Sequence, residues 1–224
     1  MNIHHDHLNT LNELMLLAYN RGWITTFDGN ASFRSAQNNV ITITPTGVRK
    51  NIMTMNHLIN VPIQQPEMSV VDACAKIMQG FQGQELRPSG ELPLHYALQR
   101  TINTAERWVV HVHATHIVAA MMAGFNLQRI AAEFGELIYT RVGPDVPVLP
   151  AQTNELGIKV AQCMQIYPDG SSDFDIVGIR QHGVVAMASD PWTAWSHIER
   201  LNHCCEIVLL CYNAKAFATP VSKE

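Results

Sequence analysis

Charged residues are scarce in this chain of 224 residues. Lysine, arginine, aspartate and glutamate make up 15% of it, and the formal net charge at pH 7 is -4. A chain with this net charge gives no reason to expect a nucleic-acid partner. A low charge fraction at this length also predicts that part of the surface is buried between subunits, so we expect a homo-oligomer.

Long apolar runs are missing as well. No stretch reaches the roughly 18 consecutive apolar residues that a transmembrane helix needs, and the polar start MNIHHDHLNT has no signal-peptide core. The five cysteines are odd in number and have neither zinc-ribbon nor redox spacing. We therefore expect a cytoplasmic protein with reduced thiols, no membrane partner and no nucleic-acid partner.

Several catalytic signatures are also absent. The chain contains neither Gly-x-Gly-x-x-Gly nor the Gly-Lys-Ser/Thr ending of a P-loop. It lacks the Gly-x-Ser-x-Gly elbow of the α/β-hydrolases and the His-Glu-x-x-His motif of zinc proteases. These absences argue against the common nucleotide, serine-hydrolase and metalloprotease sites.

Hydrophobic periodicity and turn residues divide the chain into helices and strands. Helices are expected at 8–21, from about 91 to 98, at 115–122, at 155–165 and at 191–216. Strands are expected at 31–34, 40–44, 58–63, 108–113, 146–149 and 176–180, with a hairpin-like return at 184–187. Helices thus bracket a block of short strands, which predicts an α/β fold with a central, mostly antiparallel sheet. No repeat or linker divides the chain, so residues 1–224 are expected to form a single domain.

Two histidines close an apolar strand and are the first candidates for chemistry. His111 and His113 are two apart, so their imidazoles project from the same face of the strand. Burying bare imidazoles costs free energy, and a metal ion removes that cost because neutral imidazole is a good ligand for zinc and related ions. His182 ends another apolar strand, before Gly183, and is the candidate third ligand. Three histidines would leave a coordination position open, as in catalytic sites. The alternative is that each is an ordinary core or surface histidine.

Glu91 is the candidate acid/base. A carboxylate beside an open metal site can bind the metal or exchange protons with a substrate. Local sequence alone favours the simpler interpretation, an ordinary first-turn glutamate that complements the helix dipole.

Three turns of small residues are suited to an anion: Gly29-Asn30, Thr46-Gly47 and Ser89-Gly90. Backbone N–H groups, hydroxyls and a helix N-terminus are what a phosphate group needs. Taken singly, each of these turns is more often just a turn.

In chain order, these pieces resemble the class II aldolase/adducin family. The resemblance covers roughly residues 8–215. It rests on five motifs: Gly29-Asn30-Ala31-Ser32-Phe33-Arg34, Thr44-Pro45-Thr46-Gly47, Pro88-Ser89-Gly90-Glu91-Leu92-Pro93-Leu94-His95, His111-Val112-His113-Ala114 and Gln181-His182-Gly183. Each motif is weak alone, and five of them in order are specific.

The resemblance implies a three-layer α/β/α sandwich, commonly assembled as a homotetramer with its sites near subunit interfaces. It implies one divalent metal ion per chain, most often Zn2+, on His111, His113 and His182. It also implies a small sugar-phosphate substrate, whose phosphate would be held by Asn30, Thr46, Gly47, Ser89 and Gly90. Fuculose-phosphate aldolase has a second serine where this chain has Gly90, so the pocket loses a hydroxyl there but keeps the backbone N–H.

The acidic position distinguishes branches of the family. The aldolases have glutamate after the serine pair, whereas ribulose-5-phosphate 4-epimerase has aspartate, so Glu91 favours the aldolases. The resemblance then implies cleavage of a ketose 1-phosphate to dihydroxyacetone phosphate and an aldehyde, through a metal-stabilised enediolate. Glu91 would shuttle the proton at the nucleophilic carbon. A non-catalytic, adducin-like interaction module is the alternative of another class, and the presence of all three histidines counts against it.

A second carboxylate would favour methylthioribulose-1-phosphate dehydratase, or the dehydratase of a related deoxypentulose phosphate. That branch and rhamnulose-phosphate aldolase carry a further glutamate between the histidine pair and the last histidine. Glu133 and Glu136 both fall there, and Glu133 is the better match to the dehydratase. In the aldolases, a tyrosine near the C-terminus of a neighbouring subunit donates a proton to the leaving aldehyde. Tyr212 is a candidate equivalent, the alternative being a core or interface tyrosine.

Overall fold

The computed structural model describes residues 3–35, 39–100 and 106–215. Over these residues the helices are α1 Ile3–Asn20, α2 Val70–Gly80, α3 Leu92–Gln99, α4 Thr115–Met122, α5 Leu127–Glu133, α6 Asn154–Met164 and α7 Pro191–Lys215. The strands are β1 Asn30–Arg34, β2 Val40–Ile43, β3 Ile59–Pro62, β4 Arg107–Val112, β5 Ile176–Ile179 and β6 Gly183–Ala188. Short 3-10 turns lie at Lys50–Ile52, Met55–His57 and Gly135–Leu137.

The six strands form one sheet in the order β3-β2-β1-β4-β6-β5. Every neighbouring pair is antiparallel, which confirms the predicted antiparallel sheet. β4 lies near the middle, between β1 and β6. Its register places Asn30 of β1 directly opposite His111. Side chains opposite one another in adjacent strands share a face, so Asn30 and His111 project together.

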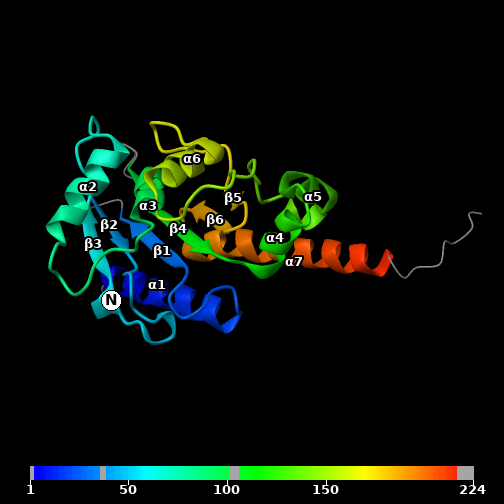
Figure 1. The fold of residues 1–224 in the computed structure, drawn as a ribbon, viewed down its shortest axis with the longest axis horizontal. Helices are drawn as coiled ribbons and strands as arrows, with labels where there is room; N and C mark the ends of the chain where they lie inside the picture. Colours follow the sequence, from blue (N-terminus) through cyan, green and yellow to red (C-terminus); the bar gives the residue numbers. More distant parts are fainter. Residues whose placement is uncertain (1–2, 36–38, 101–105, 216–224) are drawn as a thin grey trace, which may run out of the picture.

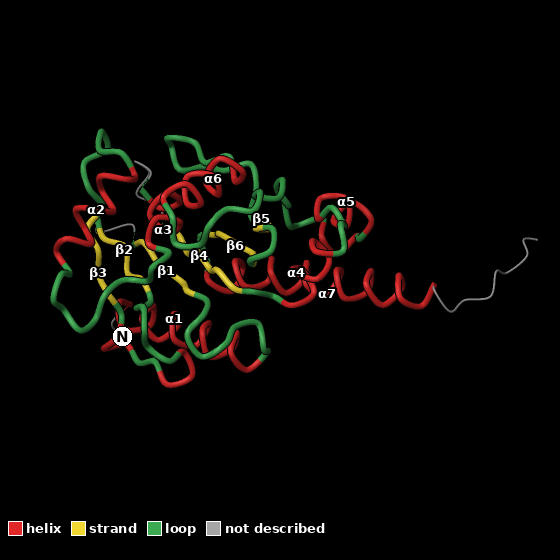
Figure 2. The backbone as a smooth tube through the Cα atoms, viewed as in Figure 1, coloured by secondary structure: helices red, strands yellow, loops and turns green. Residues whose placement is uncertain are grey.

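Helices cover both faces of the sheet, which confirms the predicted α/β/α sandwich. One layer contains α1, α4 and α7, and α1 packs on β1 while α7 packs on β4 and β6. The other contains α2, α3 and α6, and α3 packs on β1, β2 and β4 while α6 packs on β5. Figure 1 shows the two layers on opposite sides of the sheet, and Figure 2 shows the yellow strands between red helices.

The side chains of β4 alternate between these two layers. Trp108, Val110 and Val112 belong to the core beneath α1 and α7, whereas Val109 belongs to the core beneath α3 and α6. His111 projects to the same side as Val109, because the side-chain period of a strand is two. A strand buried on both faces explains why the sequence there is almost continuously apolar.

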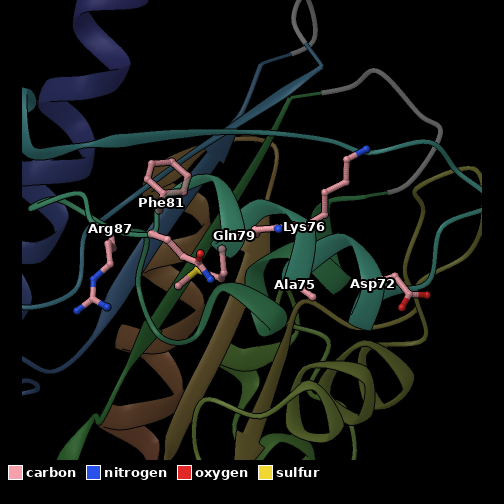
Figure 3. A pocket seen from close by; sticks show the side chains of 8 residues that line it. Asp72, Ala75, Lys76, Gln79, Phe81 and Arg87 are labelled. Carbon is pink, nitrogen blue, oxygen red and sulfur yellow. The ribbon is translucent and has the colours of Figure 1, made fainter.

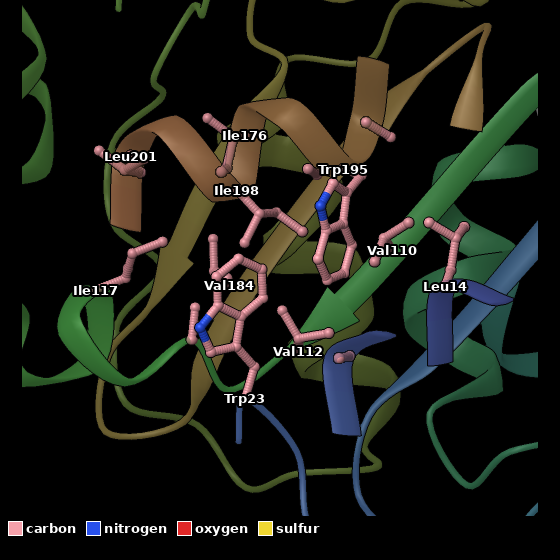
Figure 4. Close-up of a cluster of buried hydrophobic side chains, with 14 of the residues drawn as sticks. Leu14, Trp23, Val110, Val112, Ile117, Ile176, Val184, Trp195, Ile198 and Leu201 are labelled. Atoms are coloured by element: carbon pink, nitrogen blue, oxygen red, sulfur yellow. The ribbon is translucent and has the colours of Figure 1, made fainter. Parts of the chain in front are cut away.

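The core beneath α7 is dense and aromatic. The rings of Trp23 and Trp195 stack with their centroids 4.8 Å apart, and Val112 and Val184 lie beside them (Figure 4). Val112 precedes His113, and Val184 follows Gly183. This packing therefore fixes the ends of β4 and β6 that carry the histidine motifs, since well-packed interiors deform little.

One predicted strand is wrong. Residues 146–149 form no strand, and Val146 makes only an isolated parallel bridge to Ile179. Pro144, Pro147 and Pro150 lie in or beside this stretch. Proline has no backbone N–H, so the segment has too few donors for a regular ladder.

Two helices were not predicted, although each has a capping residue in the sequence. The Ser69 Oγ accepts a hydrogen bond from the backbone N–H of Asp72 at the start of α2. The Asn126 side chain does the same for Arg129 at the start of α5. Serine and asparagine are common residues at the N-cap of a helix, so the sequence carried a signal for both helix starts.

The helix α7 is 25 residues long and continues past α4 and α5 at one end of the molecule (Figure 1). None of the helices in the described part of the chain combines the length and apolarity that crossing a bilayer requires. The extent of the domain, residues 1–224, stays a prediction.

Candidate functional site

The three predicted metal-ligating histidines meet at one end of the sheet. His111 lies in β4, His113 follows its last residue, and His182 lies in the turn between β5 and β6. Their ligand atoms all lie within 4.8 Å of one another. Ring centroids are 4.9 to 5.2 Å apart. Residues distant in the chain therefore form one cluster that a single ion could bridge.

The hydrogen bonding of His111 supports a cation at this cluster. Its Nδ1 lies 3.1 Å from the backbone oxygen of Val184. A carbonyl only accepts, so Nδ1 carries the proton and Nε2 presents a lone pair. That Nε2 lies 3.1 Å from the Oε2 of Glu91, and neither atom has a hydrogen-bond partner.

Two acceptor atoms facing each other in a buried site repel unless a cation lies between them. A proton on His111 is disfavoured, because burial and the neighbouring His113 and His182 lower its pKa well below the ordinary value. Burial also lowers the pKa of His113 and of His182. All three imidazoles are thus in the neutral form that binds metals, and the donor set fits a divalent ion.

Glu91 faces this cluster from the N-terminal end of α3. It is the N-cap of α3, but its side chain makes no capping hydrogen bond. The side chain is 7% exposed, and its Oε1 lies 3.4 Å from the Nε2 of His182. A buried carboxylate against two imidazoles can act as a fourth metal ligand or as a base, which is the predicted alternative to an ordinary first-turn glutamate.

A pocket of about 210 Å³ opens at the histidines. Of the predicted phosphate-binding residues, Asn30, Thr46, Ser89 and Gly90 line it, as do the three histidines and Glu91. Gly47 is not among the lining residues. The backbones of two of the predicted turns are joined, because the Thr46 N–H donates to the Arg87 oxygen at 3.0 Å and the Ser89 N–H to the Thr44 oxygen at 3.0 Å.

A buried hydrogen-bond relay orients Asn30. The Gln99 amide donates to the Ser32 Oγ, which lies 2.6 Å from the Nδ1 of His95. The His95 Nε2 lies 2.5 Å from the Asn30 Oδ1. Burial and the nearby His111 lower the pKa of His95 to about 3, so this ring is neutral and donates once. It donates to the oxygen of Asn30, which leaves the NH₂ group of Asn30 to donate into the pocket.

Ser89 and Lys50 add further donors to the pocket. The Ser89 Oγ accepts from the Glu91 N–H at 3.2 Å, so the Ser89 hydroxyl proton is free to point elsewhere. Lys50 is 2% exposed and donates from Nζ to the backbone oxygens of Pro45 and Val48. An ammonium has three N–H donors, so one remains for a ligand. Burial lowers the pKa of Lys50, and Asp28 opposes that shift.

Three further residues with charged or amide side chains line the pocket and were not predicted from the sequence: Asp28, Lys50 and Gln152. Asp28 accepts a hydrogen bond from the Thr25 Oγ1 and places a second carboxylate near the histidines. Two had a signal, since Asp28 directly precedes the Gly-Asn turn and Lys50 closely follows the Thr-Gly turn. Gln152 lies far along the chain from every motif and had none.

The structure does not bring the other predicted acid/base residues to this pocket. Glu133 lines a separate apolar hollow with Phe125 and Val208. Glu136 accepts a hydrogen bond from the Cys204 Sγ at 3.0 Å. Tyr212 is 63% exposed on α7 and packs edge-on against Phe125. Within one chain, none of these three reaches the histidines.

A larger hollow, of about 630 Å³, lies along α2. Its charged side chains, Asp72, Lys76 and Arg87, point in separate directions (Figure 3). A binding site needs polar groups that converge, so the smaller pocket at the histidines is the candidate site.

Gly183 packs closely against the end of β4 and the ring of His113. A Cβ atom there would lie 2.6 Å from the Val112 oxygen and 2.8 Å from the Cδ2 of His113. We expect Gly183→Ala to displace the histidines and to weaken metal binding by about 10-fold to 100-fold. This is the usual effect of changing residues that hold metal ligands in place. Titration with zinc against a competing chelator measures this.

Gly80→Ala is the matched control, because a Cβ atom at Gly80 meets nothing within 4 Å. Equal zinc affinity of the two variants would contradict the role given to Gly183.

Comparison with known proteins is consistent with this geometry. The sequence profile of the class II aldolase and adducin N-terminal domain matches residues 9–209. A methylthioribulose-1-phosphate dehydratase from Coprinopsis cinerea is 26% identical over 214 residues, which cover 90% of this chain and 84% of that protein.

Solved structures share the fold. A sugar-phosphate aldolase from Thermotoga maritima superposes with a TM-score of 0.73 at 16% identity, covering 98% of this chain and 99% of the other. An L-fuculose-1-phosphate aldolase from Thermus thermophilus gives 0.67 at 20% identity, covering 95% and 97%.

Proposed function

Because the chain belongs to the class II aldolase and adducin family, we propose that it is a metal-dependent lyase acting on a small sugar phosphate. One observation carries the proposal: three neutral histidines and a buried glutamate share a pocket with donors suited to phosphate. The pocket volume, about 210 Å³, suits a small ligand.

The proposed reaction is aldol cleavage of a ketose 1-phosphate to dihydroxyacetone phosphate and an aldehyde. The bond between the third and fourth carbons breaks, and its electron pair stays on the third carbon. The hydroxyl on the fourth carbon loses a proton as it becomes the aldehyde, and the third carbon gains one. One proton moves in total, so a single carboxylate, Glu91, is sufficient as the shuttle.

The residues of the pocket divide between the two ends of such a substrate. His111, His113 and His182 would hold a divalent ion, proposed here as Zn2+, which would supply Lewis-acid polarisation of the carbonyl. The Asn30 NH₂ group, the Ser89 hydroxyl and Lys50 bind the phosphate, with Thr46 beside them. These groups are held in place before the substrate arrives, which is how preorganised dipoles stabilise developing charge.

Dehydration of methylthioribulose 1-phosphate, or of a related deoxypentulose phosphate, is the second candidate. It is favoured by the dehydratase relative that aligns over 90% of this chain. That reaction removes a proton beside the carbonyl and expels a hydroxyl as water, so it needs a base and a separate acid. Glu91 and Asp28 are the two carboxylates that line the pocket.

Glu133 and Tyr212 have a role only in an assembly. Both lie near Phe125, on the part of the molecule formed by α5 and α7. In the proposed homotetramer, with its sites near subunit interfaces, this part would reach the pocket of a neighbouring copy. The cytoplasmic location belongs to the same proposal.

Product analysis separates the candidates. The zinc-loaded protein is incubated with a panel of ketose 1-phosphates that includes fuculose, rhamnulose and methylthioribulose phosphates, and the products are followed by ³¹P NMR. Release of dihydroxyacetone phosphate is the expected result, whereas a diketo product with no loss of carbon identifies the dehydratase. Metal-stripped protein is the control.

A protein that binds no divalent ion and turns over none of these substrates would contradict the enzymatic proposal. That outcome would favour the adducin-like interaction module.

A further inference from the structure

We propose that Gln152 is a specificity-determining residue whose carboxamide binds the phosphoryl group of the substrate, in space that Gly90 leaves open. This inference rests on the proposed function, because it assigns a residue to the phosphate end of the same pocket. Gln152 lies between Pro150 and α6, and it lines the pocket although it is about 60 residues from the nearest turn predicted to bind phosphate.

The backbone of Gln152 is held in a conformation that residues with side chains rarely adopt. Its φ is 63°, in the left-handed region. The next residue, Thr153, pins this segment, because its Oγ1 donates to the Pro150 oxygen at 2.8 Å and accepts from the Leu156 N–H at 3.2 Å. Non-glycine residues in such strained positions are concentrated at functional sites, where the surrounding structure maintains them.

The side chain of Gln152 lies over Gly90. A Cβ atom built at Gly90 would lie 2.5 Å from the Gln152 Oε1 and 2.6 Å from its Cδ. Gly90 itself does not have a positive φ, so its backbone conformation does not call for glycine. The missing side chain at 90 is therefore explained by the carboxamide that fills its place.

The chemistry of the neighbouring groups indicates what this carboxamide binds. Ser89 precedes Gly90, and its hydroxyl proton is free to donate, while Asn30 and Lys50 present N–H groups to the same pocket. Phosphoryl oxygens only accept hydrogen bonds, and a carboxamide NH₂ group adds two donors to this set. Gln152 is exposed to solvent at the mouth of the pocket, so its NH₂ group can turn toward a phosphoryl oxygen without breaking a buried contact.

The contact between Gln152 and Gly90 makes substitutions at the two positions interdependent. Gln152→Ala removes the donor, and Gly90→Ser displaces the carboxamide because the new Cβ atom would overlap it. In the double variant, the serine occupies the vacated space and its hydroxyl supplies a donor at the same place. The double variant should therefore bind phosphate better than the sum of the single effects predicts.

The test is the affinity of the zinc-loaded full-length protein for inorganic phosphate, measured by isothermal titration calorimetry. We expect Gln152→Ala to weaken binding by about 10-fold, which is the loss of one hydrogen bond to a charged group. Gly90→Ser should weaken it similarly, and Gly90→Ser/Gln152→Ala should return to within about 3-fold of the unmodified protein.

Gln165→Ala is the matched control. Gln165 has the same residue type and a similar left-handed φ of 52°, but it lies at the C-terminal end of α6 and does not line this pocket. It should bind phosphate like the unmodified protein. Thermal unfolding of each variant confirms that it is folded.

Failure of this inference differs from failure of the proposed function. If the unmodified protein binds phosphate and Gln152→Ala binds it equally well, Gln152 does not recognise the phosphoryl group. Additive losses in the double variant would likewise overturn the coupling with Gly90. If the unmodified protein binds no phosphate and turns over no sugar phosphate, the proposed function fails first. Should Gly90→Ser not fold, the comparison of Gln152→Ala with Gln165→Ala still decides.

Discussion

Replacing His111 by alanine should remove both the bound metal ion and turnover. His111 is 1% exposed, and its Nε2 is fixed as a lone pair because Nδ1 donates to the Val184 oxygen. Changing a group that only supports a metal ligand lowers metal affinity by roughly 10–100-fold. Loss of the ligand His111 itself should lower zinc affinity by more than that. Turnover should fall by about 10³-fold or more, because a Lewis acid contributes several kcal/mol to stabilising the developing charge.

The measurement is the metal content per chain, by mass spectrometry of the dialysed protein, beside the rate of product formation. His203→Ala is the matched control, since His203 is exposed on α7 and outside the cluster. His113→Ala is a second test should His111→Ala not fold. A His111→Ala protein that keeps one zinc ion per chain, or keeps its turnover, would remove the histidine cluster from the mechanism.

Much of this fold follows from local sequence pattern. The apolar run that ends in His111 and His113 predicted a buried strand, and β4 is buried along its whole length. The pattern around His182 predicted a hairpin, which β5 and β6 form. Local pattern failed at 146–149, where β-branched and apolar residues suggested a strand but prolines remove the hydrogen-bond donors that a ladder needs.

The residues of the site were harder to predict from the sequence than the fold was. Motifs predicted the histidines, Glu91 and the three turns of small residues, and most of these residues line the pocket. Lys50 and Asp28 lie next to those motifs, but their burial and direction depend on how the turns fold. Gln152 could not be predicted from the sequence, since the role proposed for it depends on a contact with Gly90 that forms only once α3 and α6 pack together.

The same limit explains Glu133 and Tyr212. They were proposed because the family resemblance places acid/base residues in those regions of the chain. In a single chain they lie beside Phe125, away from the histidines. Sequence identifies the kind of residue, whereas its distance from a neighbouring subunit's site depends on the assembly.

Glu91→Gln should lower turnover and, at the same time, stabilise the protein without metal. The two effects have one cause, the position of Oε2 at 3.1 Å from the unprotonated Nε2 of His111. A carboxylate there can take up a proton from the substrate, and a carboxamide cannot. Losing a positioned acid/base group costs about 10²–10⁴-fold in rate. In the metal-free protein, the NH₂ group of glutamine can donate to Nε2 and replace two facing acceptors with a hydrogen bond.

The stability ranking should therefore reverse when metal binds. Without metal, Glu91→Gln should be more stable than the unmodified protein by about 1–3 kcal/mol, the usual cost of an unsatisfied buried polar group. Zinc should raise the free energy of unfolding more in the unmodified protein than in Glu91→Gln. Stabilisation by a ligand grows with its affinity, and a neutral carboxamide binds a cation less well than a carboxylate does. Thermal unfolding with zinc and with a chelator measures both differences.

Glu155→Gln provides the control for the helix-end interpretation. Glu155 lies in the first turn of α6 and is exposed, so losing its charge removes only the dipole interaction, about 0.3–1 kcal/mol. That change should destabilise the protein slightly, with or without zinc. If Glu91→Gln behaves in the same way and keeps its turnover, Glu91 is a first-turn glutamate after all. A reversal of stability together with lost turnover would support Glu91 as one of the residues that hold the cation with His111.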